Sequence, residues 1–229
     1  MVKLNKRKIF FIIPAYNEGS KIKKILMKIQ NCGFTPVVID DSSKDNTSFE
    51  VAKTNATLIK HSINLGQGAA LQTGFDFSIM KNADMVVTFD SDGQHSLDDA
   101  KKLIEFLVMN EDYDVAIGSR FIKKNKNIPF AKLITLKLAI LFEKLVYKTN
   151  YTDAHNGLRA IRSSALKKIQ IEHNRMAHAS ELTNQFNRNK FKIKELPVNI
   201  SYTTYSKNKG QKISNSLNII KDLLIGGFQ

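Results

Sequence analysis

The sequence predicts an α/β fold built on a mostly parallel sheet. Over the first 120 of its 229 residues, short runs of β-branched and aromatic residues alternate with longer segments of helical apolar spacing, which is the pattern of βαβ units. Polar or charged residues follow each short run, as they do where parallel strands end at one edge of a sheet. Because the chain shows neither a repeat nor a low-complexity linker, we expect a single domain over residues 1–229.

The expected strands are short and β-branched, and the expected helices place apolar residues three and four positions apart. The strands are Lys8–Ile13, Pro36–Asp40, Ala56–His61, Asp84–Phe89 and Val115–Gly118. The helices run from Ser20 to Gly33, from Thr47 or Ser48 to Thr54, from Ala69 to Met80 and from Leu97 to Met109. Gly33 is expected to end the first helix, and Ser96 to cap the last one.

The second half of the chain has a different pattern. Phe130–Tyr147 reads FAKLITLKLAILFEKLVY, and this long helix either packs in the core or lies in a membrane interface with its lysines at the headgroups. Tyr151–Ile161 is expected to be a loop. A helix over Ala177–Asn189, a strand over Lys192–Tyr202, a basic loop and a final helix over Ser214–Ile225 complete the prediction.

The chain carries 35 basic and 21 acidic residues, a net charge of +14. Such a charge favours an anionic partner, which could be nucleic acid, anionic lipid or a phosphorylated small molecule. General solubility accounts for a lysine-rich composition equally well. The charge alone therefore does not identify the partner.

Cysteine content and hydropathy restrict the redox compartment and the membrane topology that we expect. The single cysteine, Cys32, excludes a disulfide framework, argues against a cysteine-based zinc site and indicates a reducing, cytoplasmic compartment. The apolar run near the N-terminus, Ile9–Ile13, is five residues long and stops at Pro14, so we expect a first strand there and no signal peptide. No apolar run reaches the roughly 18 residues that a membrane span needs.

The strand expected at Asp84–Phe89 ends in the sequence DSDGQH, with two acids one residue apart. Like charges this close raise each other's cost of ionisation, and an extended chain places Asp90 and Asp92 on one side. Two carboxylates and the Gln94 amide suit Mg²⁺ or Mn²⁺, so a cation and the diphosphate that it carries would balance the charges. A turn that caps the next helix is the alternative. We expect His95 to be satisfied by backbone rather than to bind the cation.

Polar groups follow the other expected strands at the same edge. They are Pro14–Glu18, Asp40–Asp41, Asn64–Gly68 and Ser119–Arg120, and five such groups in register predict a site. Gly66 and Gly68 do not fit the dinucleotide fingerprint, because the next glycine is Gly74. We interpret them as part of a loop and a close helix contact.

Several motifs in this order resemble family 2 glycosyltransferases, in particular the branch that makes dolichyl- and polyprenyl-phosphate sugars. They are IIPAYNE, VVIDDSSKDNT, HSINLGQGAALQTG, TFDSDGQH, IGSRF, NGLRAI and YTTYSKNKGQ. The resemblance extends from Ile12 to about Asp222. It implies the GT-A type of nucleotide-diphospho-sugar transferase fold, with residues 1–120 binding the nucleotide and residues 121–229 facing the acceptor and the membrane.

The resemblance also implies roles for individual residues of this chain. Nucleobase and ribose would be held by Pro14, Tyr16, Glu18, Ile39 and Asp41. Asp90, Ser91 and Asp92 would flank the diphosphate, and Asp90, Asp92 and Gln94 would hold Mg²⁺ or Mn²⁺. Catalysis would use Asp92, Arg120 on the acceptor phosphate and Glu181 near the donor sugar, while Asn156, Gly157 and Arg159 would shape the sugar or acceptor pocket. Lys207 and Lys209 match a basic loop that closes on the diphosphate.

In that basic loop the family usually has an arginine. In this chain the basic residues between Phe191 and Lys212 are all lysines. Lysine offers a point charge and cannot donate the two parallel hydrogen bonds of an arginine guanidinium. Which of Lys207, Lys209 or Lys212 contacts the diphosphate therefore stays open.

The implied activity is inverting, metal-dependent transfer of a sugar from a nucleotide-diphosphate sugar to a polyprenyl phosphate, dolichyl or undecaprenyl. It would take place at the cytoplasmic face of a membrane, with the protein bound peripherally. One alternative is transfer to a saccharide or protein hydroxyl, which needs a base such as Asp92, Asp153 or Glu181. A basic nucleic-acid-binding protein is less consistent with the sequence, which lacks a recognition-helix or stacking-sheet pattern.

Overall fold

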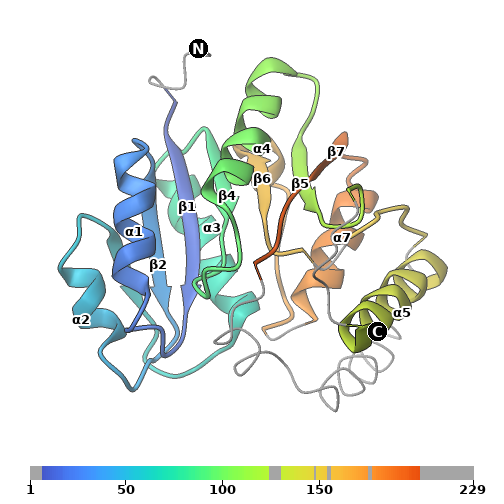
Figure 1. Ribbon diagram of the computed structural model, residues 1–229. Coiled ribbons are helices and arrows are strands. Elements are labelled where there is room, and N and C mark those ends of the chain that lie inside the picture. Colours follow the sequence, from blue (N-terminus) through green and yellow to red (C-terminus); the bar gives the residue numbers. More distant parts are fainter. Residues whose placement is uncertain (1–6, 124–129, 147, 154–155, 175–176, 202–229) are drawn as a thin grey trace.

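The computed structural model describes residues 7–123, 130–146, 148–153, 156–174 and 177–201. Within these ranges a central sheet has helices on both faces (Figure 1). The strands are β1 (Ile9–Ala15), β2 (Thr35–Asp40), β3 (Thr57–Lys60), β4 (Met85–Thr88), β5 (Val115–Ser119), β6 (Arg159–Arg162) and β7 (Ile193–Pro197). The helices are α1 (Ile22–Asn31), α2 (Thr47–Ala52), α3 (Gln67–Met80), α4 (Leu97–Met109), α5 (Phe130–Val146), α6 (Ser163–Leu166) and α7 (His178–Arg188). Lys207, Lys209, Lys212 and the helix expected at Ser214–Ile225 lie outside the described residues.

The sheet has the order β3-β2-β1-β4-β6-β5-β7. Among the described strands, only β6 runs antiparallel to its neighbours, β4 and β5, and the other pairs are parallel. Strands β1 to β5 therefore all point their carboxyl ends to the same edge, as the sequence predicted. The α/β class and the mostly parallel sheet are confirmed.

The sequence pattern of Tyr151–Ile161 predicts a loop, which is wrong for the part that forms strand β6. The strand has only four residues and begins and ends with arginine, so it shows no apolar run. Its pairing with β4 and β5 on either side makes it a strand, which is a tertiary effect that overrides local propensity. The expected strand Lys192–Tyr202 is shorter than predicted, since β7 ends at Pro197.

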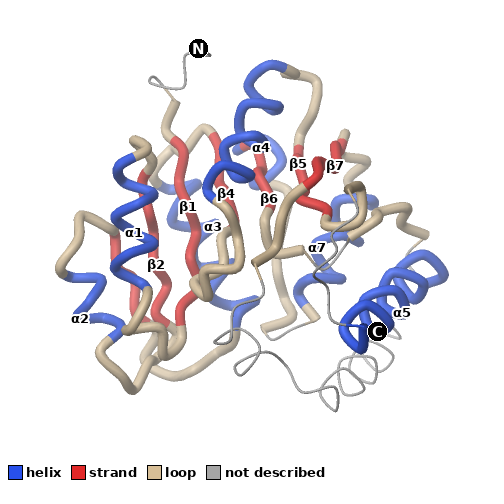
Figure 2. The backbone as a smooth tube through the Cα atoms, in the orientation of Figure 1, coloured by secondary structure: helices blue, strands red, loops and turns tan. Residues whose placement is uncertain are grey.

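Helices lie on both faces of the sheet (Figure 2), and two apolar layers hold them to it. One layer joins α1, α2 and α4 to one face, around Phe11, Leu26 and Leu103. The other joins α3, α6 and α7 to the opposite face, around Ile12, Phe75 and Phe186. Since strand residues alternate between faces, neighbouring residues such as Phe11 and Ile12 belong to different layers.

The helix ends follow the expected local signals. Gly33 adopts a positive φ of 79° just after α1, and its N–H bonds to the carbonyl of Gln30 at 2.8 Å, which ends the helix. At α4, the Ser96 side chain accepts a hydrogen bond from the N–H of Asp98 at 3.2 Å. The helix boundaries predicted there, Leu97 and Met109, are the observed ones.

Helix α5 lies beside α7 (Figure 1). The Thr183 hydroxyl of α7 donates to Oε2 of Glu143 on α5 at 2.7 Å, and Glu143 is buried. No helix among the described residues is long and apolar enough to cross a membrane.

Glycines permit the close approach of α3 to the structure around it. A Cβ atom on Gly74 would lie 2.3 Å from Cγ2 of Ile12 and 3.0 Å from Cδ1 of Ile39, both in the sheet. A Cβ atom on Gly68 would lie 2.0 Å from the carbonyl oxygen of His173. The interpretation of Gly68 as a close helix contact is confirmed.

Gly74→Ala is expected to destabilise the protein by about 1–2 kcal/mol. Overpacking against Ile12 costs about 1–3 kcal/mol, and the higher helix propensity of alanine offsets up to about 1 kcal/mol. The free energy of unfolding in urea measures the effect. Asp76→Ala, at an exposed position of the same helix, is the control and should change stability by less than about 0.5 kcal/mol. A Gly74→Ala protein as stable as the wild type would contradict this packing.

Candidate active site at the carboxyl edge of the sheet

The loops that follow the parallel strands contact one another. The Ser91 hydroxyl, after β4, donates to the carbonyl of Pro14 in β1 at 3.0 Å. The N–H of Asp41, after β2, bonds to the carbonyl of Ala15 at 2.9 Å. The polar groups predicted to share one edge are thus brought together there.

The carboxylate of Asp41 organises the loop between β3 and α3. It accepts hydrogen bonds from the N–H groups of Leu65, at 2.8 Å, and Gly66, at 2.7 Å. Its Oδ1 also lies 2.8 Å from Nδ1 of His61, whose Nε2 lies 3.0 Å from the Thr73 hydroxyl. Asp41 therefore fixes the shape of the loop beside the predicted nucleotide pocket.

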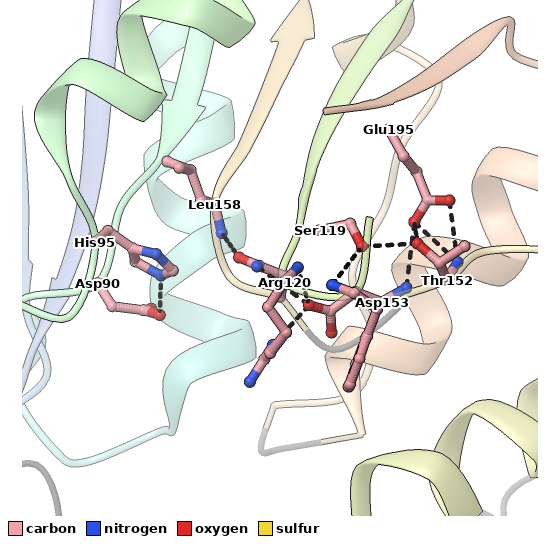
Figure 3. A network of polar contacts seen from close by, with 10 residues as sticks. Asp90, His95, Ser119, Arg120, Thr152, Asp153, Leu158 and Glu195 are labelled. Carbon is pink, nitrogen blue, oxygen red and sulfur yellow. Dashed lines mark hydrogen bonds and ion pairs between the residues drawn. The ribbon is translucent and has the colours of Figure 1, made fainter. Parts of the chain in front are cut away.

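Both oxygens of the Asp90 carboxylate are held by side chains, one from the start of α3 and one from the same loop as Asp90. Nε2 of Gln67 donates to Oδ1 at 3.0 Å, and Nε2 of His95 lies 2.9 Å from Oδ2 (Figure 3). Because an ionised carboxylate only accepts, the histidine nitrogen donates. The expectation that backbone would satisfy His95 is wrong, since this contact is with a carboxylate.

The two acids of the motif differ in their electrostatics. Burial acts to raise the pKa of Asp90, but the hydrogen bond from His95 and the charges of His95, Arg159 and His178 outweigh it, so this pKa lies below its ordinary value. Burial, followed by the charge of Asp90, raises the pKa of Asp92, against an opposing backbone hydrogen bond from Gln94. Asp92 is therefore the carboxylate that would gain more from a bound cation.

Arg159 contributes a buried positive charge that acts on Asp90. Its side chain is 1% exposed, and burial lowers its pKa while the charges of Asp90, Glu143 and Asp153 oppose that shift. The protein itself thus supplies part of the counter-charge that the sequence predicts for a bound cation. A bound cation would therefore mainly neutralise the charge of Asp92.

Arg120, at the end of β5, pairs with Asp153 (Figure 3). Oδ2 of Asp153 accepts from Nε of Arg120 at 2.6 Å and from its N–H at 2.9 Å. The two side chains are 7% and 1% exposed, so the pair is buried. Asn156 adds a weaker contact to the same oxygen at 3.4 Å.

The remaining predicted residues lie in varied surroundings. Tyr16 is 39% exposed, and Glu18 is buried, with its N–H bonded to the Thr47 hydroxyl at 2.8 Å. Ile39 is fully buried in the apolar layer beneath α3 and offers no surface to a ligand in this structure. Glu181 accepts hydrogen bonds from the N–H groups of residues 172 and 173, at 2.8 and 2.9 Å, so it holds the loop before α7.

The residues of the motif fit a hard divalent cation. No cluster of three or more histidine, cysteine or acidic side chains that could hold a metal occurs within the described ranges. Mg²⁺ needs none, because it binds through one or two carboxylates plus substrate phosphates and water. Asp92 uses Oδ1 to accept the N–H of Gln94 at 2.9 Å, which fixes its side chain in the turn. This donor set suits Mg²⁺ or Mn²⁺ that arrives with a diphosphate.

Comparison with known proteins decides the family. The model of glycosyl transferase family 2 matches residues 10–170. The chain belongs to this family. It is 35% identical to a UDP-N-acetylglucosamine–dolichyl-phosphate N-acetylglucosaminyltransferase of Methanococcus voltae, over 95% of each chain. It is 27% identical to a polyprenol monophosphomannose synthase of Mycolicibacterium smegmatis, over 82% of this chain and 75% of that protein.

A solved structure confirms the GT-A type fold. Glucosyl-3-phosphoglycerate synthase from Mycobacterium tuberculosis, in complex with Mn²⁺, UDP and glucosyl-3-phosphoglycerate, superimposes with a TM-score of 0.70. The match covers 97% of this chain and 80% of that one, at 17% sequence identity. At this identity the likeness concerns the fold.

Gly157→Ala tests how tightly Asp90 is held. A Cβ atom on Gly157 would lie 2.3 Å from Oδ2 of Asp90, so the carboxylate would have to leave Gln67 and His95. We expect a loss of about 3 kcal/mol or more in the free energy of unfolding, because two hydrogen bonds to a charged group are lost and each contributes about 1.5–3 kcal/mol. In an Asp90→Ala background the same change should cost less than about 0.5 kcal/mol. Equal costs in the two backgrounds would contradict the contact.

Proposed function

We propose that this protein transfers a sugar from a nucleotide-diphosphate sugar to a polyprenyl phosphate, with inversion at the anomeric carbon. The observation that carries the proposal is the pair formed by Asp90 and Asp92. Gln67 and His95 hold both oxygens of Asp90, whereas Asp92 accepts the backbone N–H of Gln94 and keeps a raised pKa. This asymmetry suits a site that receives its cation with the donor. The names of the relatives, which act on dolichyl and polyprenyl phosphates, support the acceptor class.

The donor would lie along the carboxyl edge of β1, β2 and β4. Tyr16, Glu18 and Asp41 would surround its nucleoside, and Ser91 would lie near its diphosphate. A cation bound by Asp92 and Gln94 beside Asp90 would neutralise the charge that develops on the departing diphosphate. The side chains of Gln67 and His95 would keep Asp90 fixed throughout.

The acceptor phosphate would be bound by Arg120. A phosphate is already anionic near neutral pH, so its attack needs orientation and charge screening rather than a strong base. Two of the acids that could activate a hydroxyl acceptor are occupied: Asp153 pairs with Arg120, and Glu181 holds backbone N–H groups. These contacts favour the phosphate acceptor over a saccharide or protein hydroxyl.

Helix α5 would bring the site to a lipid surface. Four of its exposed apolar residues are four and three positions apart, which puts them on one face: Ile134, Leu138, Leu141 and Leu145. Val146, the last residue of the helix, is also exposed but lies off this face. The exposed Lys137 and Lys144 lie along one side of that face, while the buried Glu143 is on the opposite side. Apolar residues flanked by lysines are typical of helices at an anionic membrane surface.

Incubation with a panel of labelled UDP- and GDP-sugars, a polyprenyl phosphate and Mg²⁺ or Mn²⁺ tests the proposal. We expect a lipid-linked product with one donor class and loss of that product on adding a chelator. If label moves to a saccharide hydroxyl and never to the lipid phosphate, the proposed acceptor is wrong.

Asp92→Asn should lower the transfer rate by about a hundredfold or more, which corresponds to about 2.7 kcal/mol of lost charge stabilisation. Because the pKa of Asp92 is raised, its ionised form opposes folding at neutral pH. The variant should therefore be at least as stable as the wild type in thermal unfolding. Asp98→Asn, at an exposed acid of α4, is the matched control and should retain activity. Normal turnover by Asp92→Asn would remove this acid from the site.

Replacing Lys137 and Lys144 by glutamine should weaken binding to vesicles that contain anionic lipid by about thirtyfold. Each lysine near such a surface contributes about 1 kcal/mol, and 1.4 kcal/mol is a factor of ten. Vesicle sedimentation at low and high salt measures the effect. Lys24→Gln with Lys28→Gln, on the exposed side of α1, removes the same charge elsewhere and should have little effect. Equal loss from both pairs would mean that the total charge, and not α5, binds the lipid.

A further inference from the structure

Glu195 of β7 is at the start of a chain of polar contacts that ends at Arg120 (Figure 3). Its carboxylate accepts the N–H of Thr152 at 2.9 and 3.0 Å, one distance to each oxygen. Oε1 also accepts the Thr152 hydroxyl at 3.0 Å and the N–H of Asp153 at 3.2 Å. One carboxylate thus fixes the backbone of two successive residues in a loop 42 residues earlier in the chain.

The loop that Glu195 holds carries the acid that pairs with Arg120. Oδ2 of Asp153 receives both Nε and the backbone N–H of Arg120. A single oxygen therefore accepts hydrogen bonds from both the backbone and the side chain of the arginine. Because the side-chain contact uses Nε, it sets the orientation of the planar guanidinium and of its two terminal NH₂ groups.

A second link ties the same loop to the end of β5. Oγ of Ser119 lies 2.7 Å from the Thr152 hydroxyl and accepts the N–H of Phe121 at 3.2 Å. Residues on both sides of Arg120 are thus connected to the loop at Thr152. Ser119 is fully buried, whereas Thr152 is exposed, so this link fastens a surface loop to the buried end of β5.

Stability alone does not account for this arrangement. A buried ion pair costs desolvation and is often no more stabilising than apolar packing of the same volume. What a buried, doubly bonded pair does provide is a fixed orientation. An arginine that must meet a phosphate bidentately depends on such an orientation.

We propose that Asp153 and Glu195 are positioning residues for the acceptor phosphate: Asp153 orients the Arg120 guanidinium, and Glu195 holds the loop that carries Asp153. This inference rests on the proposed function, in which Arg120 binds the phosphate of the acceptor. Neither acid touches the acceptor. Their effect on the reaction is exerted through Arg120.

Glu195→Gln is the test variant, because it keeps the shape of the side chain but removes its charge and one of its two accepting oxygens. An amide oxygen at Oε1 can still accept, more weakly than a carboxylate, while the NH₂ group at Oε2 would face the Thr152 N–H as a second donor. With geranylgeranyl phosphate as acceptor, we expect its KM to rise about tenfold, or 1.4 kcal/mol, and the donor KM to change less than about twofold. In an Arg120→Ala background, Glu195→Gln should have no further effect on the acceptor KM. Glu111→Gln, on an 82% exposed side chain, is the control. An unchanged acceptor KM, or an equal rise in both backgrounds, would overturn the inference.

The orientation of Arg120 can also be followed without any substrate. In arginine-labelled protein, the Nε–H signal of Arg120, assigned by its loss in Arg120→Lys, should exchange slowly with water because of the bond to Asp153. Glu195→Gln should speed this exchange about tenfold, and Asp153→Asn, which keeps an accepting oxygen, should speed it less than Asp153→Ala. Unchanged exchange in Glu195→Gln would overturn this inference alone. A wild-type protein that modifies no polyprenyl phosphate would instead overturn the proposed function.

Discussion

The arrangement of the site depends on one negative charge, the carboxylate of Asp90, whose side chain is 30% exposed and lies where the loops of the sheet meet. Gln67 from the start of α3 and His95 from the loop before α4 each hold one of its oxygens. Because Gly157 has no Cβ atom, the carboxylate can occupy the space beside it. Three segments far apart in the sequence are thus placed relative to one another by a single side chain, which must stay ionised to accept all its bonds.

The antiparallel strand β6 links the two halves of the site. It lies between β4, which ends at the acid pair, and β5, which ends at Arg120. Arg159 enters the core from this strand and acts electrostatically on Asp90 as well as on Asp153. A buried cation that acts on acids of both halves reduces the repulsion that would otherwise accompany their burial, so the acid pair after β4 and the Arg120–Asp153 pair share one charge balance.

Local chemistry predicted much of the architecture. The period-two and helical patterns gave the parallel strands β1 to β5 and the helices α1 to α4 within a few residues, because each of these elements has an apolar face that must be buried. The short strand β6 could not be found in this way, because two of its four residues are arginines and its place depends on β4 and β5. Similarly, His95 and Asp153 were recognised as polar residues, but their partners lie in the loops that the fold brings to them.

The sequence by itself determined the fold class, the gathering of polar loops at one edge and the family to which the chain belongs. These follow from patterns within single segments and from the order of the motifs. Only the tertiary structure decided which acid of the pair is compensated, which acid holds Arg120 and which face of α5 is left exposed. Such properties arise from distances between residues far apart in the chain, and burial and charge act through those distances rather than through neighbours in sequence.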